Sequence, residues 1–170
     1  PLTENFIRQL HKLLLKEDHY VDAITPDGQP TQKKVRVGEY KSTPNHVKTK
    51  TGEIFRFATP EETPAKMNDL MKWLREKEKA KDTTPILLAA DFHYKFIRIH
   101  PFDDGNGRVA RILMNFILMQ NGYPPVIIKT QEKAEYIATL RQADAGIFEP
   151  FFEFVITNEV NSLELILKGA

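Results

Sequence analysis

The segment HPFDDGNGRVAR, which begins at His100, combines residue types that could bind phosphate and accept a proton. Gly105 and Gly107 would let the backbone curl so that successive N–H groups converge on one anion. Arg108 and Arg111 lie three residues apart, so on a helix both can reach the same ligand face and hold more than one phosphate. The imidazole of His100 titrates near neutral pH and is a candidate general base. The pattern predicts a polyphosphate site with a proton acceptor beside it.

Two adjacent aspartates in this segment indicate that a cation binds there. Phosphate would repel a carboxylate placed next to it unless a cation lay between them. Asp103 or Asp104 is therefore a candidate ligand of Mg²⁺ that bridges phosphates. Each residue of the segment, taken singly, also fits an ordinary turn or a solvated helix end. Apolar runs flank the segment on both sides, however, and charged groups between buried helices are costly unless something binds them.

Other phosphate and metal motifs do not fit the sequence. It contains neither GxxxxGK[ST] nor HExxH, and GNGRVA lacks the third glycine of GxGxxG and follows a helical pattern. His93 lies seven residues before His100 and could share a helix face with it. Because apolar residues surround His93, we expect a hydrogen-bonded core histidine there and not a metal ligand.

Helices are expected to position this segment. Apolar residues recur at helical spacing, with Thr3 as a candidate N-cap, a capping box at Thr59 and Pro101 disfavouring helix at His100. The predicted helices span 2–17, 60–79, 85–100, 107–120, 131–145 and 149–167. Turn residues and alternating stretches between residues 18 and 58 predict a short β-hairpin or flap around a long loop. The expected fold class is all-α with a small β-flap.

Composition narrows the functional classes. The chain has 170 residues, the size of one domain, a formal net charge of +1 and no cysteine. A nucleic-acid partner is not expected at this net charge, and a thiolate metal site or disulfide cannot form. No apolar run approaches the roughly 20 residues that span a bilayer, so no membrane partner is expected. The first residue is Pro1 in place of an initiator methionine, from which we expect a trimmed or processed start.

The segment matches the signature HxFx[DE]GNGRxxR at every specified position, and on this ground the chain resembles the Fic family. The flanking sequences HYKFIRIHPF and LMNFILMQNGYPPVII look like the core helices of the family, and VGEYK resembles the approach to its flap. The resemblance covers essentially the whole chain. It implies a Fic-type helical domain over residues 1–170, with a β-hairpin flap at about 35–58 over an active-site loop at 100–111.

The resemblance also implies residue roles. Fic domains most often transfer AMP from ATP to a hydroxyl side chain of a target protein and release pyrophosphate. His100 would deprotonate the target Ser, Thr or Tyr, and Asp104 would hold Mg²⁺. The residues expected to hold ATP are Asp104, Gly105, Asn106, Gly107, Arg108, Arg111 and, against adenine, Tyr136. Ile54 and Phe55, in the flap over this site, would complete the set and clamp the target segment by strand addition. Phe102 would anchor the loop.

The alternatives to AMP transfer are transfer of phosphate or another nucleotide fragment, removal of AMP, and nucleotide binding without catalysis. The expected partners are ATP and a target protein, with a homodimer as a further possible state, and the expected location is the cytoplasm.

Many Fic proteins carry an inhibitory helix that reads [ST]xxxE[GN]. Only Glu53 has a Ser or Thr four residues before it, at Thr49, and Ile54 follows where Gly or Asn is required. We therefore expect residues 1–170 to represent a derepressed form, with such a helix upstream in any longer chain.

Overall fold

The computed structural model of the protein describes residues 1–25, 27–45, 47–48 and 54–169. The chain divides into two compact units, one formed by residues 1–75 with 95–110 and the other by residues 76–94 with 111–170. The single Fic domain expected over residues 1–170 stays a prediction. Thr49 and Glu53 of the inhibitory-motif search, and part of the expected flap, lie outside the described residues.

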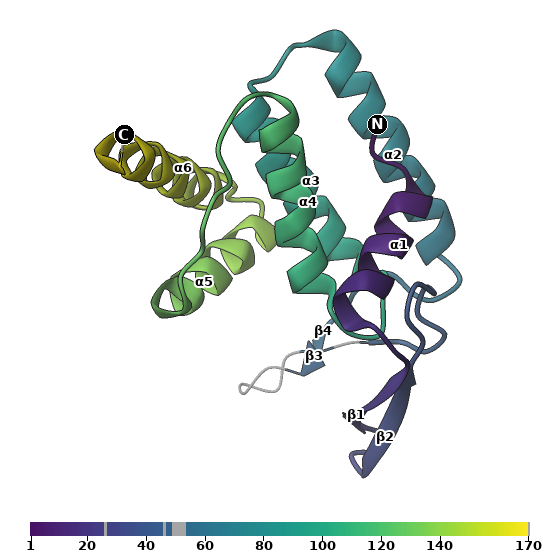
Figure 1. The fold of residues 1–170 in the computed structure, drawn as a ribbon. Coiled ribbons are helices and arrows are strands. Elements are labelled where there is room, and N and C mark those ends of the chain that lie inside the picture. The colour runs from purple at the N-terminus through teal and green to yellow at the C-terminus, as the bar shows by residue number, and fades with distance from the viewer. Residues whose placement is uncertain (26, 46, 49–53, 170) are drawn as a thin grey trace. The chain divides into compact units, whose positions relative to one another are not determined.

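The described residues are mostly helical, which confirms the predicted fold class (Figure 1). In chain order the elements are α1 (Glu4–Leu15), β1 (His19–Ile24), β2 (Pro30–Val35), β3 (Val47–Lys48), β4 (Ile54–Phe55), α2 (Thr63–Ala80), α3 (Pro85–Ile99), α4 (Asn106–Gln120), the 3-10 helix η1 (Thr130–Glu132), α5 (Lys133–Asp144) and α6 (Glu149–Gly169). All six predicted helices are present. The strands form two antiparallel pairs, β1 with β2 and β3 with β4, where the sequence indicated one hairpin or flap.

Local sequence signals set the helix ends of the first unit. Thr3 caps α1, accepting a hydrogen bond on Oγ1 from the N–H of Phe6 at 3.1 Å. Thr59 and Glu62 form the predicted capping box, since each side chain accepts from the backbone N–H of the other residue, at 3.2 Å and 2.9 Å. One turn, residues 60–62, separates Thr59 from the start of α2. The capping signals were therefore read correctly, and α2 begins three residues later than predicted.

The β1–β2 hairpin follows α1 directly (Figure 1). Its register pairs His19 with Val35 and Val21 with Lys33. Val35 is fully buried, whereas most side chains of the two strands are exposed or half-buried. The hairpin therefore packs against the rest of its unit mainly at the end where β1 begins and β2 stops.

The second unit contains α5 and α6, which pack together. Its interior holds the fully buried His93, whose Nε2 lies 2.7 Å from the hydroxyl of Tyr136. Phe151 stacks on the same imidazole, with ring centroids 5.7 Å apart. His93 is thus the hydrogen-bonded core histidine that the sequence predicted. In the part of the chain that the structure describes, no cluster of three His, Asp or Glu side chains could hold a metal ion.

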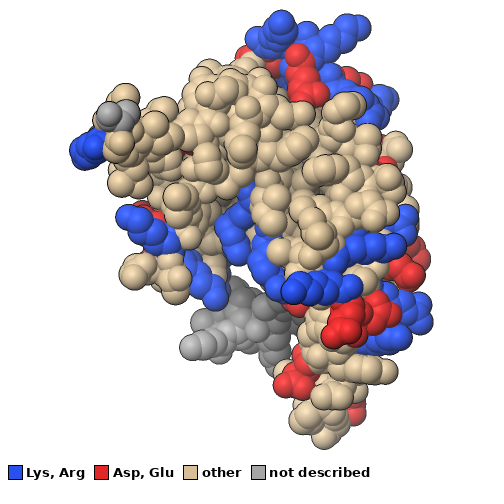
Figure 2. Space-filling model, viewed as in Figure 1, with Lys and Arg blue, Asp and Glu red and all other residues tan. Residues whose placement is uncertain are grey.

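Charged side chains of both signs lie next to one another on parts of the face that Figure 2 draws. Figure 2 shows Lys and Arg alternating with Asp and Glu where α2 ends, a stretch that reads REKEKAKD. Among the described helices, none combines the length and apolar character that a membrane span requires.

Candidate active site

The loop that begins at His100 joins α3 to α4 within the first unit. The N–H of His100 still donates to the carbonyl of Phe96 at 3.0 Å, but its φ is +52°. This left-handed conformation is uncommon for a residue other than glycine and is found mostly where the surroundings enforce it. Here the carbonyl of Pro101 accepts a hydrogen bond from the N–H of Lys41 at 2.8 Å. The loop is thereby tied to the segment that follows β2.

Gly105 shapes the start of α4. Its φ is +79°, and a Cβ atom at this position would lie 3.2 Å from Cδ1 of Leu15 on α1. A side chain at this position would therefore strain the backbone and crowd Leu15. The first helical hydrogen bond of α4 runs from the N–H of Val109 to the carbonyl of Gly105, at 2.9 Å. The helix thus leaves the N–H groups of residues 106–108 without an intrahelical acceptor, as an anion site requires.

Gly107 contributes differently from expectation. The sequence suggested that both glycines curl the loop, but Gly107 lies in the first turn of α4 and only Gly105 has positive φ. Asn106, which precedes it, is 2% exposed. Its Oδ1 accepts from the N–H of Phe102 at 2.9 Å, and its Nδ2 donates to the carbonyl of Phe102 at 2.7 Å. The side chain of Asn106 therefore closes the loop on itself at the first residue of α4.

The imidazole of His100 is enclosed by two amides and an aromatic ring. Nδ2 of Asn45 lies 2.7 Å from Nδ1 of His100, and Nδ2 of Asn106 lies 3.1 Å from the same atom. Phe57 stacks on the imidazole with ring centroids 4.2 Å apart and planes 14° apart. Asn45 and Phe57 flank the β3–β4 pair in sequence, so the predicted flap region contacts the candidate base.

Burial, with the positive charges of Lys41 and Lys33, lowers the pKa of His100 to about 3. Lys41 is itself 3% exposed, and its Nζ donates to Oδ1 of Asn45 at 2.8 Å and to the carbonyl of Ile99 at 3.1 Å. Burial, followed by the charge of Lys33, lowers the pKa of Lys41 to about 8. At neutral pH the imidazole is therefore uncharged, which a proton acceptor must be.

Removing the Lys41 charge is expected to raise the pKa of His100. Burial of the ring remains in Lys41→Met, so the pKa should stay below the ordinary 6.5. The matched control is Lys34→Met, because Lys34 pairs with the half-exposed Asp18. An NMR titration of the His100 ring checks the shift, and an unchanged or lower pKa in Lys41→Met would contradict the assignment. Between pH 6.5 and about 3 only the unfolded chain binds this proton, so acidification lowers stability within that window.

The two aspartates have different surroundings. The side chain of Asp103 is 5% exposed and forms an ion pair with Lys33 on β2. The side chain of Asp104 is 37% exposed, with Oδ2 2.9 Å from an Nη of Arg108 and 3.5 Å from Nε2 of His19. Asp103 therefore fastens the loop to the hairpin, whereas Asp104 remains accessible to a ligand. This supports the choice of Asp104 over Asp103 as a metal ligand, which stays a prediction.

His11 on α1 contacts the loop through its ring. The sequence analysis did not identify it. It is fully buried and stacks on Phe102, with centroids 3.9 Å apart. The N–H of Gly38 donates to its Nδ1 at 2.8 Å, so the proton is on Nε2 and is donated to the carbonyl of Asp104 at 3.0 Å. Burial lowers the pKa of His11, which keeps the ring neutral in this role.

Arg111 and Tyr136 belong to the second unit. Tyr136 is 6% exposed, and burial raises its pKa to about 12 despite a hydrogen bond with Arg111. The first unit brings together His100, Asp104, Gly105, Asn106, Gly107, Arg108 and the flap strand that contains Phe55. The side chain of Ile54 lies outside the described residues. A role of Arg111 and Tyr136 in holding ATP stays a prediction from the motif.

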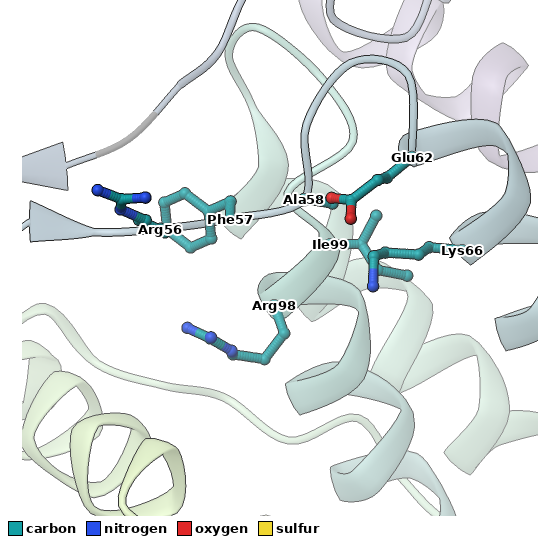
Figure 3. Close-up of a pocket in the computed structure, with 7 residues that line it drawn as sticks. All are labelled: Arg56, Phe57, Ala58, Glu62, Lys66, Arg98 and Ile99. Carbon is teal, nitrogen blue, oxygen red and sulfur yellow. The ribbon is translucent and has the colours of Figure 1, made fainter.

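A cleft of about 290 Å³ lies next to the candidate base (Figure 3). Its walls come from the segment after β4, the start of α2 and the end of α3: Arg56, Phe57, Ala58, Glu62, Lys66, Arg98 and Ile99. The guanidinium of Arg98 lies over the ring of Phe55, 4.5 Å from its centroid. Figure 3 shows the side chains of Arg56 and Arg98 extending toward the same side of the cleft. Among the described residues of the lining, Arg56 and Lys66 add positive charge beside the single carboxylate of Glu62, which suits a negatively charged ligand.

The sequence analysis did not identify four residues that contact the loop or the residue before it: Asn45, Lys41, Lys33 and His11. Their contacts join residues 55 or more positions apart, so they leave no local sequence pattern. A sequence signal was present for Asn45: it is an amide in the polar stretch STPNHV, which belongs to the flap region expected to lie over the base.

Comparison with known proteins gives concordant results. Residues 1–118 match the family model described as Fic/DOC family. A "Protein adenylyltransferase Fic" of Nematostella vectensis is 38% identical over 154 residues, which cover 91% of this chain and 31% of the relative. A "Protein adenylyltransferase fic-1" of Caenorhabditis elegans is 40% identical over 110 residues, which cover 65% of this chain and 22% of the relative. The chain thus spans less than a third of the length of these curated relatives.

Solved structures show the same fold. A Fic domain containing signaling protein from Bacteroides thetaiotaomicron superimposes with a TM-score of 0.88 at 40% identity, over 99% of this chain and 63% of that protein. A structure of Fic-1 from C. elegans superimposes with a TM-score of 0.72 at 30% identity, over 97% of this chain and 43% of that protein.

Proposed function

The chain belongs to the Fic/DOC family, and from this premise we propose that it is a protein adenylyltransferase, which moves AMP from ATP to a Ser, Thr or Tyr hydroxyl of a target protein. The observation that carries the proposal is the placement of a neutral imidazole beside a helix start with free N–H groups, on the motif that defines the family. Both curated relatives named above are protein adenylyltransferases.

At the α-phosphorus the reaction forms one bond and breaks one, and a proton moves from the target to the base. The target hydroxyl oxygen attacks the α-phosphorus, the bond from this phosphorus to the β-phosphate oxygen breaks, and pyrophosphate leaves. His100 accepts the hydroxyl proton. Its low pKa makes it a weak base, but the negative charge of a bound triphosphate acts against the effect of Lys33 and Lys41 and raises its basicity. Such a base contributes roughly 10²–10⁴-fold to the rate.

The chain's own residues supply the remaining catalysis by positioning and charge neutralisation. The N–H groups of residues 106–108, at the positive end of the α4 dipole, bind phosphate oxygens. Arg108 would leave its ion pair with Asp104 to bind the outer phosphates. In this proposal Arg111 binds the outer phosphates as well. Tyr136 contacts adenine in this proposal, and the β3–β4 flap with Ile54 and Phe55 covers the bound nucleotide and target.

Asp104 fits a Mg²⁺ ligand. One accessible carboxylate suffices for Mg²⁺, which is commonly held by one or two carboxylates together with substrate phosphates. The described residues offer no set of three acidic or histidine ligands, so the metal would bind together with ATP. When bound, Mg²⁺ would neutralise charge on the phosphates.

Neutralising Asp104 is expected to remove the gain in ATP affinity that Mg²⁺ provides. Substitution of a residue that only hydrogen-bonds to a metal ligand typically lowers metal affinity roughly 10–100-fold. Because Asp104 would bind the metal directly, Asp104→Asn should weaken Mg²⁺–ATP binding by at least roughly tenfold. The companion variant Asp103→Asn should retain most of this gain but unfold at lower temperature, because it leaves Lys33 half-buried without its partner. Calorimetry with and without Mg²⁺ separates the two, and equal losses of Mg²⁺-dependent affinity would disprove the assignment.

The target segment would add as a strand to the β3–β4 pair and reach His100 past the cleft of Figure 3. The cations Arg56 and Lys66 favour a target with acidic residues next to the modified hydroxyl. Modification sites that lack neighbouring acidic residues would contradict this part of the proposal.

Incubation of the chain with labelled ATP, Mg²⁺ and a cell lysate, followed by mass spectrometry, tests the function. The expected product is an AMP adduct on a hydroxyl side chain, formed about 10²–10⁴-fold more slowly by His100→Asn. A phosphate or another nucleotide fragment would indicate the alternative transfer reaction, and loss of AMP from modified proteins would indicate removal. ATP binding without any adduct would indicate a regulator. A cytoplasmic location and a homodimer remain part of the proposal, to be tested by imaging and by light scattering.

A further inference from the structure

The hydrogen bonds around His100 determine which of its ring nitrogens carries the proton. Asn45 is oriented by Lys41, whose ammonium can only donate and lies 2.8 Å from Oδ1 of Asn45. The NH₂ end of Asn45 must therefore face His100, where Nδ2 lies 2.7 Å from Nδ1, 3.1 Å from the His100 carbonyl and 2.9 Å from the Phe102 carbonyl. The two carbonyls can only accept, so they also require the NH₂ end of Asn45 on this side.

Asn106 is oriented independently of Asn45. The N–H of Phe102 donates to Oδ1 of Asn106 at 2.9 Å, which leaves Nδ2 to face the Phe102 carbonyl and Nδ1 of His100. Two NH₂ groups, each fixed by a different donor, thus point at one ring nitrogen. A hydrogen on Nδ1 would meet both of them, so Nδ1 must carry the lone pair.

We propose that Asn45 is a positioning residue that, with Asn106, holds resting His100 in the tautomer protonated on Nε2. The protonated ring, with hydrogens on both nitrogens, is disfavoured by the same contacts. This agrees with the low pKa of His100.

This tautomer has a consequence for catalysis, which rests on the proposed function. Nδ1 is enclosed by the two amides and Phe57 covers a ring face, so Nε2 is the nitrogen that can meet a target hydroxyl. With a hydrogen on Nε2 the ring donates there and cannot accept. Proton acceptance then requires the hydrogen to move to Nδ1, which Asn45 opposes. Asn45 must therefore release Nδ1 before His100 can accept the proton on Nε2.

Serine proteases indicate the size of such an effect. Exchange of the aspartate behind their catalytic histidine for asparagine leaves the wrong tautomer and lowers kcat about 10⁴-fold. The opposite exchange, Asn45→Asp, would place a carboxylate acceptor at Nδ1. We expect kcat for AMP transfer to rise by at least about tenfold and by no more than the roughly 10⁴-fold seen in the proteases. KM for ATP should change little.

The decisive experiment is ¹⁵N NMR of the histidine rings in the whole chain at neutral pH. His100 should show a protonated Nε2 and an unprotonated Nδ1, assigned by comparison with His100→Asn. Asn45→Asp should move the hydrogen toward Nδ1, and Asn45→Ala, which adds no charge, should give a mixture of tautomers. Asn115→Asp is the matched control, because the Asn115 amide binds the backbone of Val126 and should leave the His100 signals unchanged.

A hydrogen on Nδ1 of resting His100 would overturn the proposal, as would an unchanged tautomer in both Asn45 variants. A tautomer that moves as expected without a rise in kcat would overturn the catalytic consequence. If no variant transfers AMP while the NMR results hold, the proposed function fails and the tautomer assignment stands.

Discussion

Replacement of His100 by asparagine should lower AMP transfer by about 10²–10⁴-fold while ATP affinity stays near that of the native chain. The transfer falls because the proton acceptor is lost, and affinity is kept because the imidazole is not a phosphate ligand in the proposed mechanism. Initial rates of adduct formation and calorimetry with ATP measure the two effects. A variant with nearly native transfer would show that His100 is not the base.

Asparagine is preferred to alanine for a conformational reason. His100 has φ +52°, and asparagine tolerates the left-handed region better than alanine does. His100→Ala should therefore lose as much transfer as His100→Asn but also some stability. The pair separates the chemistry of the ring from the backbone conformation of the loop.

Truncation of Phe102 should cause the largest loss of stability among substitutions in the loop. Phe102 is fully buried and contacts His11, Tyr40 and Phe96, with ring centroids at 3.9 Å, 5.7 Å and 6.5 Å. Phe102→Ala leaves a cavity between α1 and the loop, and such changes cost about 3–5 kcal/mol. Urea unfolding measures the loss.

Phe102→Leu should cost less, because it fills more of the cavity. Phe152→Ala serves as the control, since Phe152 is only half-buried and contacts other aromatic rings of α6 and the residues just before it. A loss in Phe102→Ala no larger than in Phe152→Ala would mean that Phe102 does not anchor the loop.

The sequence predicted the elements whose signals are local. Thr3, the Thr59–Glu62 capping box and the end of α3 before His100 all follow from residues within four positions of each helix end. The extent of the β1–β2 hairpin was not predicted, because its strands are mostly exposed and lack a continuous alternation of apolar side chains.

The motif indicated where α4 begins and which segment holds the candidate base, whose role stays a prediction, but not the groups that surround that base. Lys41 and Asn45 act on His100 across 55 or more residues, and no periodicity indicates such a contact. Gly107 was assigned the same conformation as Gly105, since spacing alone cannot tell a left-handed residue from a helical one. Long-range polar contacts therefore remain the part that needs a structure.

The pairing of β1 with β2 connects a distant turn to the loop. Lys33, opposite Val21, reaches Asp103 only in the observed register. A slip of one residue would turn Lys33 to the other face of the hairpin. Insertion or deletion of a single residue between Ile24 and Pro30 could impose such a slip. The length of this connection, far from any reacting atom in sequence, thus specifies which strand residue neutralises the carboxylate beside the candidate metal ligand.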